Sequence, residues 1–138
     1  MKEGGGNEFF SYKENQLSLD PKGNLVGALV CTPEIFSVIY KLEQERVKRK
    51  GHTSLLFRIN FAKTAKGVEK ELKSRFVKQL RSNLRAGDSL SILDGEIYIL
   101  TYDISINEWA VIVKRIIGLI EKAEVKAKFE LECEVVAG

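Results

Sequence analysis

The sequence contains few of the residues from which disulfides, metal centres and membrane spans are built. Its 138 residues include two cysteines and one histidine. Cys31 and Cys133 are far apart and form no Cys-x-x-Cys pair, so we expect two reduced, packed thiols, no metal site and no cofactor. The longest apolar runs, Leu25 to Cys31 and Trp109 to Ile120, are too short or too interrupted to cross a bilayer.

The chain also has no large excess of positive or negative charge, since its formal net charge is only +3. A charge this small permits a phosphate-bearing ligand but does not require one. The chain begins Met-Lys-Glu-Gly-Gly-Gly and has no apolar signal core. We therefore expect a cytoplasmic protein with no membrane partner.

The first 30 residues differ from the rest of the chain. Glycines at positions 4–6, with Pro21 and Gly23, punctuate a segment with little periodicity. We interpret residues 1–30 as a linker or domain junction, whether or not they are part of a longer protein. Residues 31–138 are long enough for one domain with its own core.

Three amphipathic helices are predicted within this domain. The first begins at the N-cap Thr32, with Pro in its first turn. Its predicted apolar stripe is Ile35, Phe36, Ile39 and Leu42. The second spans about residues 67–84 and repeats an apolar side chain every four residues. The third follows a capping box of Ser105 and Glu108, and we expect its Trp109 to pack in the core.

Strands are predicted between these helices. Residues 54–61 form an apolar run, and residues 125–135 alternate between apolar and charged side chains. Asp94-Gly95 lies between two β-rich runs, which is a strong hairpin signal. The order is a leading helix and then βαββαβ. This order predicts an α+β, ferredoxin-like antiparallel sheet with all helices in one layer.

One segment of this arrangement resembles a known family. Arg85-Ala86-Gly87-Asp88 is followed, after five residues, by Asp94-Gly95-Glu96-Ile97-Tyr98. This spacing resembles the GGDEF domain of diguanylate cyclases, over residues 32–138. Residues 27–43 are similar to the GGDEF-like module attached to some bacterial transcriptional activator domain regulators. That resemblance implies a non-enzymatic module in signal transduction or transcription regulation, partnered by a neighbouring regulatory or DNA-binding domain or by a second copy.

The turn of the family motif is degenerate in this chain. The second glycine and the aromatic survive as Gly95 and Tyr98, and the third position carries Glu96. Ile97 replaces the fourth-position acid, and Asp94 has a side chain where the family has glycine. Glu96 therefore has few of its catalytic partners, and we interpret it as a solvated turn acid.

The family's metal-binding positions in the first strand are replaced as well. They fall on Arg58 and Asn60, of which the first repels a cation and the second offers only a neutral carbonyl. Cyclase chemistry needs two divalent cations. We therefore predict no catalytic residues and no enzymatic activity.

Three functions remain open from the sequence. The first is a regulatory or scaffolding module without a ligand. The second is a cyclic di-GMP receptor, because the resemblance implies a product-binding site at Arg85 and Asp88, to which Arg81 could add a donor. The alternative interpretation of this pair is that it only connects a helix to a strand. The third is an RNA- or DNA-binding module, with stacking candidates Phe57, Phe61 and Tyr98.

The single histidine offers little chemistry by its context. His52 lies in the loop between the first helix and the first strand, next to Gly51. No partner for it is evident in the sequence. We therefore expect it to be exposed and without a catalytic role.

Overall fold

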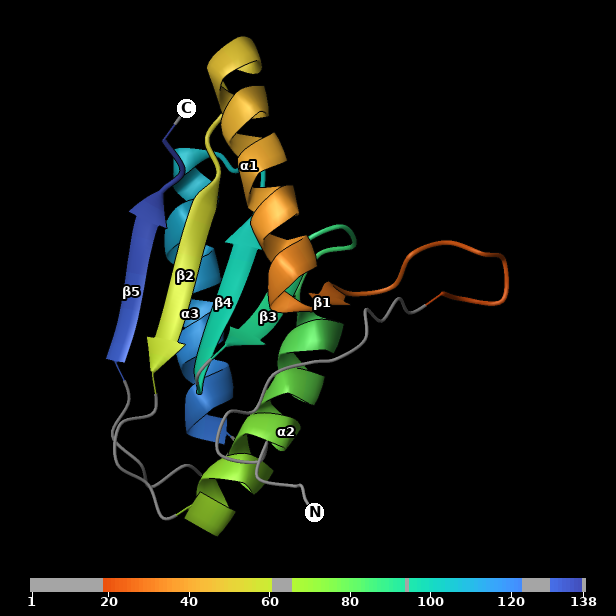
Figure 1. Cartoon of the computed structure of the whole chain (residues 1–138), viewed down its shortest axis with the longest axis vertical. Helices are drawn as coiled ribbons and strands as arrows, with labels where there is room; N and C mark the ends of the chain where they lie inside the picture. The colour runs from red at the N-terminus through yellow and green to blue at the C-terminus, as the bar shows by residue number, and fades with distance from the viewer. Residues whose placement is uncertain (1–18, 61–65, 94, 123–129, 138) are drawn as a thin grey trace.

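The computed structural model describes residues 19–60, 66–93, 95–122 and 130–137 (Figure 1). The helices are α1 (Pro33–Lys50), α2 (Lys66–Asn83) and α3 (Ile106–Lys122). The strands are β1 (Leu29–Cys31), β2 (Leu55–Asn60), β3 (Ser89–Leu93), β4 (Glu96–Thr101) and β5 (Glu130–Val135). The fold class is α+β, as predicted.

The five strands form one mixed sheet in the order β1-β3-β4-β2-β5. The pairs β3–β4, β4–β2 and β2–β5 are antiparallel, whereas β1 runs parallel to β3. The prediction of an antiparallel sheet is therefore wrong at this edge. It missed β1 because a three-residue strand has too short a pattern to detect.

The folded region begins earlier than the predicted boundary at residue 31. Ala28 is buried, and its N–H donates to the Arg81 carbonyl over 2.9 Å. The N–H of Leu29 donates to the Asp88 carbonyl over 2.8 Å. Gly27 has a φ of 73°, and a Cβ there would lie 2.1 Å from the Arg81 carbonyl oxygen. Residues 1–18 of the predicted linker lie outside the described residues.

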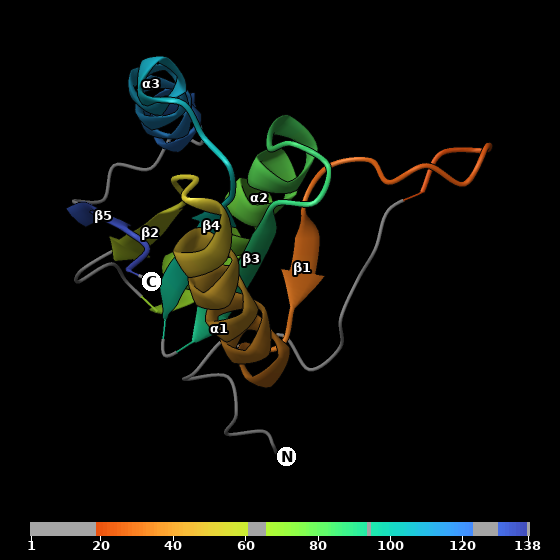
Figure 2. The ribbon, with the colours of Figure 1, turned by 90° about the horizontal axis from the view of Figure 1, so that it is seen from above.

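The helices cover both faces of the sheet, which is a correction of the predicted single layer (Figure 2). Helices α2 and α3 cover one face, and α1 covers the other. The apolar strand β2 explains this arrangement, because Phe57 packs in the core under α2 and α3 while Leu56 packs toward α1. A strand with apolar side chains on both faces needs cover on both.

Helix α1 forms where predicted, and its buried face includes part of the predicted stripe, since Phe36 is buried and Ile39 packs beside it. Thr32 accepts the N–H of Ile35 as the N-cap, and Gly51 ends the helix with a φ of 69°. Phe36 is buried with Glu43, whereas Ile35 is 40% exposed. The predicted stripe member Leu42 is 51% exposed. The apolar pattern did not predict this face fully, because the face carries the charged residue Glu43.

The described part of the last strand falls within its predicted range. Strand β5 covers Glu130–Val135, and residues 123–129 lie outside the described residues. Leu131 and Cys133 pack toward α2 and α3, in keeping with the predicted alternation. Val135 is 61% exposed, however, and Val136 is buried on the α1 side instead.

Candidate functional site

The predicted hairpin is confirmed, and it brings the degenerate motif to one end of the sheet. Leu93 and Glu96 face each other across a two-residue connection, and Gly95 has a φ of 79°. Asp94 lies outside the described residues. Ile97, at a position where the predicted resemblance expects an acid, is fully buried in the core. Tyr98 is half-buried, and its ring centroid lies 6.3 Å from that of Phe36.

Arg58 occupies the surface between two carboxylates on neighbouring strands. Its Nε lies 3.2 Å from Oε2 of Glu96, and its guanidinium also pairs with Glu132. The register explains this arrangement. Arg58 is directly opposite Glu132 on β5, and Glu96 lies on β4 two residues away from the residue opposite Arg58. Glu96 is therefore an ion-paired acid rather than a solvated one. Asn60 lies directly opposite Glu96 and Glu130.

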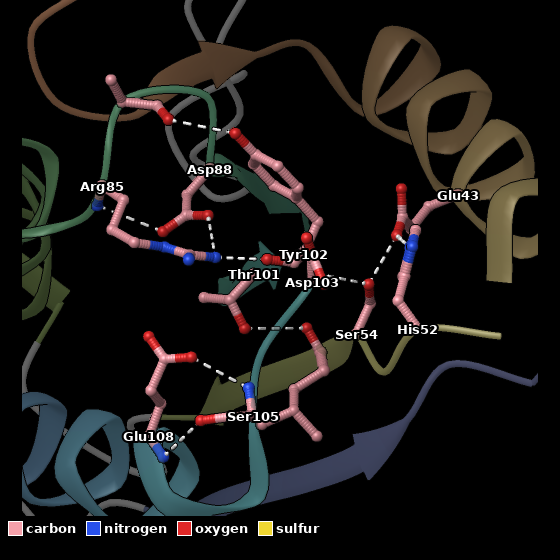
Figure 3. A network of polar contacts seen from close by, with 12 residues as sticks. Glu43, His52, Ser54, Arg85, Asp88, Thr101, Tyr102, Asp103, Ser105 and Glu108 are labelled. Carbon is pink, nitrogen blue, oxygen red and sulfur yellow. Dashed lines mark hydrogen bonds and ion pairs between the residues drawn. The ribbon is translucent and has the colours of Figure 1, made fainter. Parts of the chain in front are cut away.

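Arg85 and Asp88 do come together, at the turn between α2 and β3 (Figure 3). The Arg85 N–H donates to Oδ2 of Asp88 over 3.1 Å, and Nη2 lies 3.5 Å from Oδ1. The same guanidinium donates to the Tyr102 carbonyl and lies 5.2 Å from the centroid of the Tyr102 ring. These contacts hold the turn and the end of β4 together, as the connecting interpretation of the pair predicts.

The environment of Asp88 determines whether its carboxylate can bind a ligand. Its side chain is only 2% exposed. Burial raises the pKa of the Asp88 carboxyl, and the opposing effect of the Arg85 charge and hydrogen bonds is smaller. An acid this buried and this fully bonded does not present a free acceptor to solvent.

A cavity lies beside this pair, between the turn after α2 and helix α3. Its volume is about 200 Å³. Its polar lining includes Arg85, Asp88, Glu108 and Arg115. Arg81 is not among its lining residues; its backbone carbonyl binds the segment before β1 instead. Two arginines and two acids leave the cavity close to electrically balanced.

A buried carboxylate at Glu43 forms a second polar cluster, which the sequence did not reveal (Figure 3). Oε2 of Glu43 accepts from the Ser54 hydroxyl over 2.5 Å and lies 2.6 Å from Nε2 of His52. Ser54 Oγ also accepts the Asp103 N–H over 3.1 Å. The prediction that His52 is exposed and unpartnered is wrong, since its side chain is 17% exposed.

This second cluster joins elements rather than forming a reaction centre. Ser54 is fully buried, so no substrate can reach its hydroxyl. Both His52 and Ser54 bind the carboxylate of Glu43, whereas an activated serine would be hydrogen-bonded to the histidine. One signal could have identified the cluster, because Glu43 lies seven residues, or two helical turns, after the buried Phe36.

The predicted aromatic stacking positions are placed differently by the structure. Phe57 is fully buried and cannot stack on a base, and Phe61 lies outside the described residues. Trp109 is 46% exposed, so its predicted core role is wrong. Its first-turn position leaves the indole close enough to Cys133 to oppose, in part, the burial that raises the pKa of that thiol.

Comparisons with protein-family models, with curated proteins and with solved structures find no match. The resemblance to GGDEF domains therefore stays a prediction. Within the described residues, no helix has the length and apolar character to cross a membrane. The same residues contain no group of three or more His, Cys, Asp or Glu side chains that could hold a metal ion.

Proposed function

We propose that the chain is a non-catalytic GGDEF-like regulatory and interaction module of a bacterial signalling or transcription regulator. The order β3-β4-β2-β5 agrees with a ferredoxin-like arrangement of the βαββαβ unit, and this supports the resemblance. Strand β1 and helix α1 are additions to that unit.

The observation that carries the proposal is the position of the Arg58 guanidinium. It pairs with Glu96, the one acid that the turn keeps at an acidic position of the family motif, and lies at a position that the resemblance assigns to a metal ligand. A divalent cation placed beside this fixed positive charge would be repelled. Without two metal ions, the triphosphate chemistry of a cyclase has no electrostatic support.

The test is turnover of GTP by the full chain with Mg²⁺ or Mn²⁺, followed by pyrophosphate release. We expect no release above a protein-free control, and no binding of Mn²⁺ by electron paramagnetic resonance. Glu96→Gln is the matched control, because it removes the only acid that the turn keeps at an acidic position of the family motif. Release that is present in the wild type and lost in Glu96→Gln would reject the proposal.

Cyclic di-GMP reception is the second candidate function. The observation that favours it is that Arg85 and Asp88 line one cavity, together with Arg115. The burial of Asp88 and its bonds to Arg85 favour the first proposal instead.

Calorimetric titration with cyclic di-GMP separates the two candidates. Arg85→Ala is the test variant, and Arg49→Ala on α1 is a control with the same loss of charge at an exposed site. Binding that is lost in Arg85→Ala but kept in Arg49→Ala would support a receptor. The absence of heat in all three proteins is the result we expect.

A further inference from the structure

Helix α1 covers only part of its face of the sheet, and two grooves lie beside it. Among the described helices α1 alone lies on this face, and Figure 1 shows that it leaves β2 and β5 uncovered. The first groove, of about 300 Å³, borders α1 from Pro33 to Tyr40. The second, of about 550 Å³, lies over β2 and β5. Leu56 and Tyr98 line both grooves, so the two adjoin.

Three aromatic rings line the first groove, namely those of Phe36, Tyr40 and Tyr98. Phe36 and Tyr40 are four residues apart, so they lie one above the other on the same face of α1. The ring centroids of Phe36 and Tyr98 are 6.3 Å apart, with the ring planes tilted by 51°. None of the described residues that line this groove is charged. Aromatic rings in such a setting attract organic cations, because their faces carry partial negative charge.

A carboxylate lies at the β5 end of the same surface. Glu134 lines the second groove and is directly opposite Leu56, which lines both. Directly opposite residues point to the same face of a sheet, with Cβ atoms about 5 Å apart. Burial, and then the charge of Glu134, raise the pKa of the Tyr40 hydroxyl, so this carboxylate lies near that aromatic residue as well.

The charges at the second groove leave an excess of negative charge. Its charged lining residues are Arg58, Glu132 and Glu134. Arg58 pairs with Glu132 and also with Glu96, so two acids share its positive charge. Glu134 is exposed and forms no ion pair within the described residues. A positively charged ligand therefore fits this end of the surface better than an anion does.

We infer that this surface binds a small organic cation, with its ammonium group toward Glu134 and Tyr40 and its apolar body against Phe36 and Tyr98. The ligand class is an amine on an aromatic or short aliphatic body. Both groove volumes fall within the range of small-molecule sites. The inference goes beyond the proposed function, because it needs neither the GGDEF resemblance nor the Arg85 site.

The expected affinity is modest. An exposed ion pair and a contact between a cation and an aromatic ring each strengthen binding only several-fold. For a ligand with about ten non-hydrogen atoms, we expect a dissociation constant of about 1 mM or somewhat tighter.

Titration of the full chain, followed by the amide chemical shifts in nuclear magnetic resonance spectra, tests the inference. The probe is phenethylamine, compared with the neutral phenethyl alcohol and the anionic hydrocinnamate. All three carry the same ring, and only the amine carries a positive charge. We expect saturable binding of the amine, binding of the alcohol that is weaker by about threefold or more, and no binding of hydrocinnamate.

Variants separate the charge from the rings. Glu134→Gln should weaken amine binding by about threefold or more and leave alcohol binding unchanged. Glu130→Gln is the matched control, because it removes the same charge from an exposed residue of β5 that lines neither groove. Tyr98→Leu should weaken the binding of both compounds, because it removes a ring that both contact. Circular dichroism of each variant checks that the fold is retained.

Equal binding of the amine and the alcohol would overturn the inference. Equal weakening in Glu134→Gln and Glu130→Gln would overturn it as well, since it would show only an effect of net charge. So would the absence of saturable binding both by phenethylamine and by the aliphatic hexylamine. GTP turnover is measured separately, so a failure to bind amines rejects only this inference, and turnover rejects only the non-catalytic role.

Discussion

His52 Nε2 lies 2.6 Å from Oε2 of Glu43, and this contact ties the loop after α1 back to the middle of that helix. Ser54 at the start of β2 binds the same oxygen. The cluster therefore fixes the position of α1 over the sheet.

Removing the Ser54 hydroxyl should destabilise the domain. Ser54→Ala takes one donor from the buried Glu43 carboxylate and one acceptor from the Asp103 N–H. We expect a loss of about 1–3 kcal/mol in the free energy of unfolding, measured by urea denaturation. Ser82→Ala is the matched control, because its hydroxyl is exposed and bonds only within α2. An equal loss in both variants would contradict the role of the cluster.

The close approach of Gly27 to α2 predicts a strong dependence on side-chain size. Gly27→Ala adds a Cβ 2.1 Å from the Arg81 carbonyl oxygen, at a φ of 73°. We expect a loss of at least about 3 kcal/mol in thermal or urea unfolding. Gly23 has a similar φ of 85° but nothing within 4 Å, so Gly23→Ala should cost only about 1 kcal/mol. Similar losses at both sites would contradict this prediction and show that the backbone near Gly27 shifts to make room for the added Cβ.

The raised pKa of Asp88 predicts a pH-dependent difference between the wild type and Asp88→Asn. A carboxyl whose pKa is raised in the folded state favours folding when it is protonated, and this contribution is lost as the pH rises through that pKa. The free energy of unfolding of the wild type, relative to Asp88→Asn, should therefore increase as the pH falls from neutral toward 3.8. Urea unfolding of both proteins over this range measures the difference. A constant difference would show that burial does not shift the pKa.

The orientation of α1 can be tested on its two faces. Phe36→Ala removes a buried ring, and we expect it to cost about 3 kcal/mol or more in the free energy of unfolding. Val38→Ala shortens an exposed side chain and should change the stability of the domain by less than about 0.5 kcal/mol. The reverse order of losses would place the other face of α1 against the sheet.

The elements with strong local signals were predictable from the sequence. Thr32 caps α1, and Ser105 and Glu108 form the predicted capping box, in which the Ser105 N–H donates to Glu108 Oε1 over 2.9 Å. The two-residue connection of the hairpin was also predictable, because a glycine with positive φ suits it. These features depend on neighbours within a few residues of each other, and so their pattern is present in the sequence itself.

The candidate sites were predictable only in part. The spacing of Arg85 and Asp88 correctly predicted that these two side chains lie together. It did not predict that Asp88 is buried or that Arg85 also binds the Tyr102 carbonyl. The sequence also suggested that Arg58 excludes a metal. Its pairing with Glu132 depends on the register of β2 against β5, which no local pattern reveals.

The sequence by itself determined the helices and the hairpin, because each depends on residue type and short spacing. Tertiary structure alone decided which face of α1 is buried, that β1 joins the sheet parallel to β3, and that His52 has a partner. The physical reason is that burial is a property of two surfaces. A stripe such as Ile35, Val38 and Leu42 has the same pattern whether it packs on its own sheet or stays exposed.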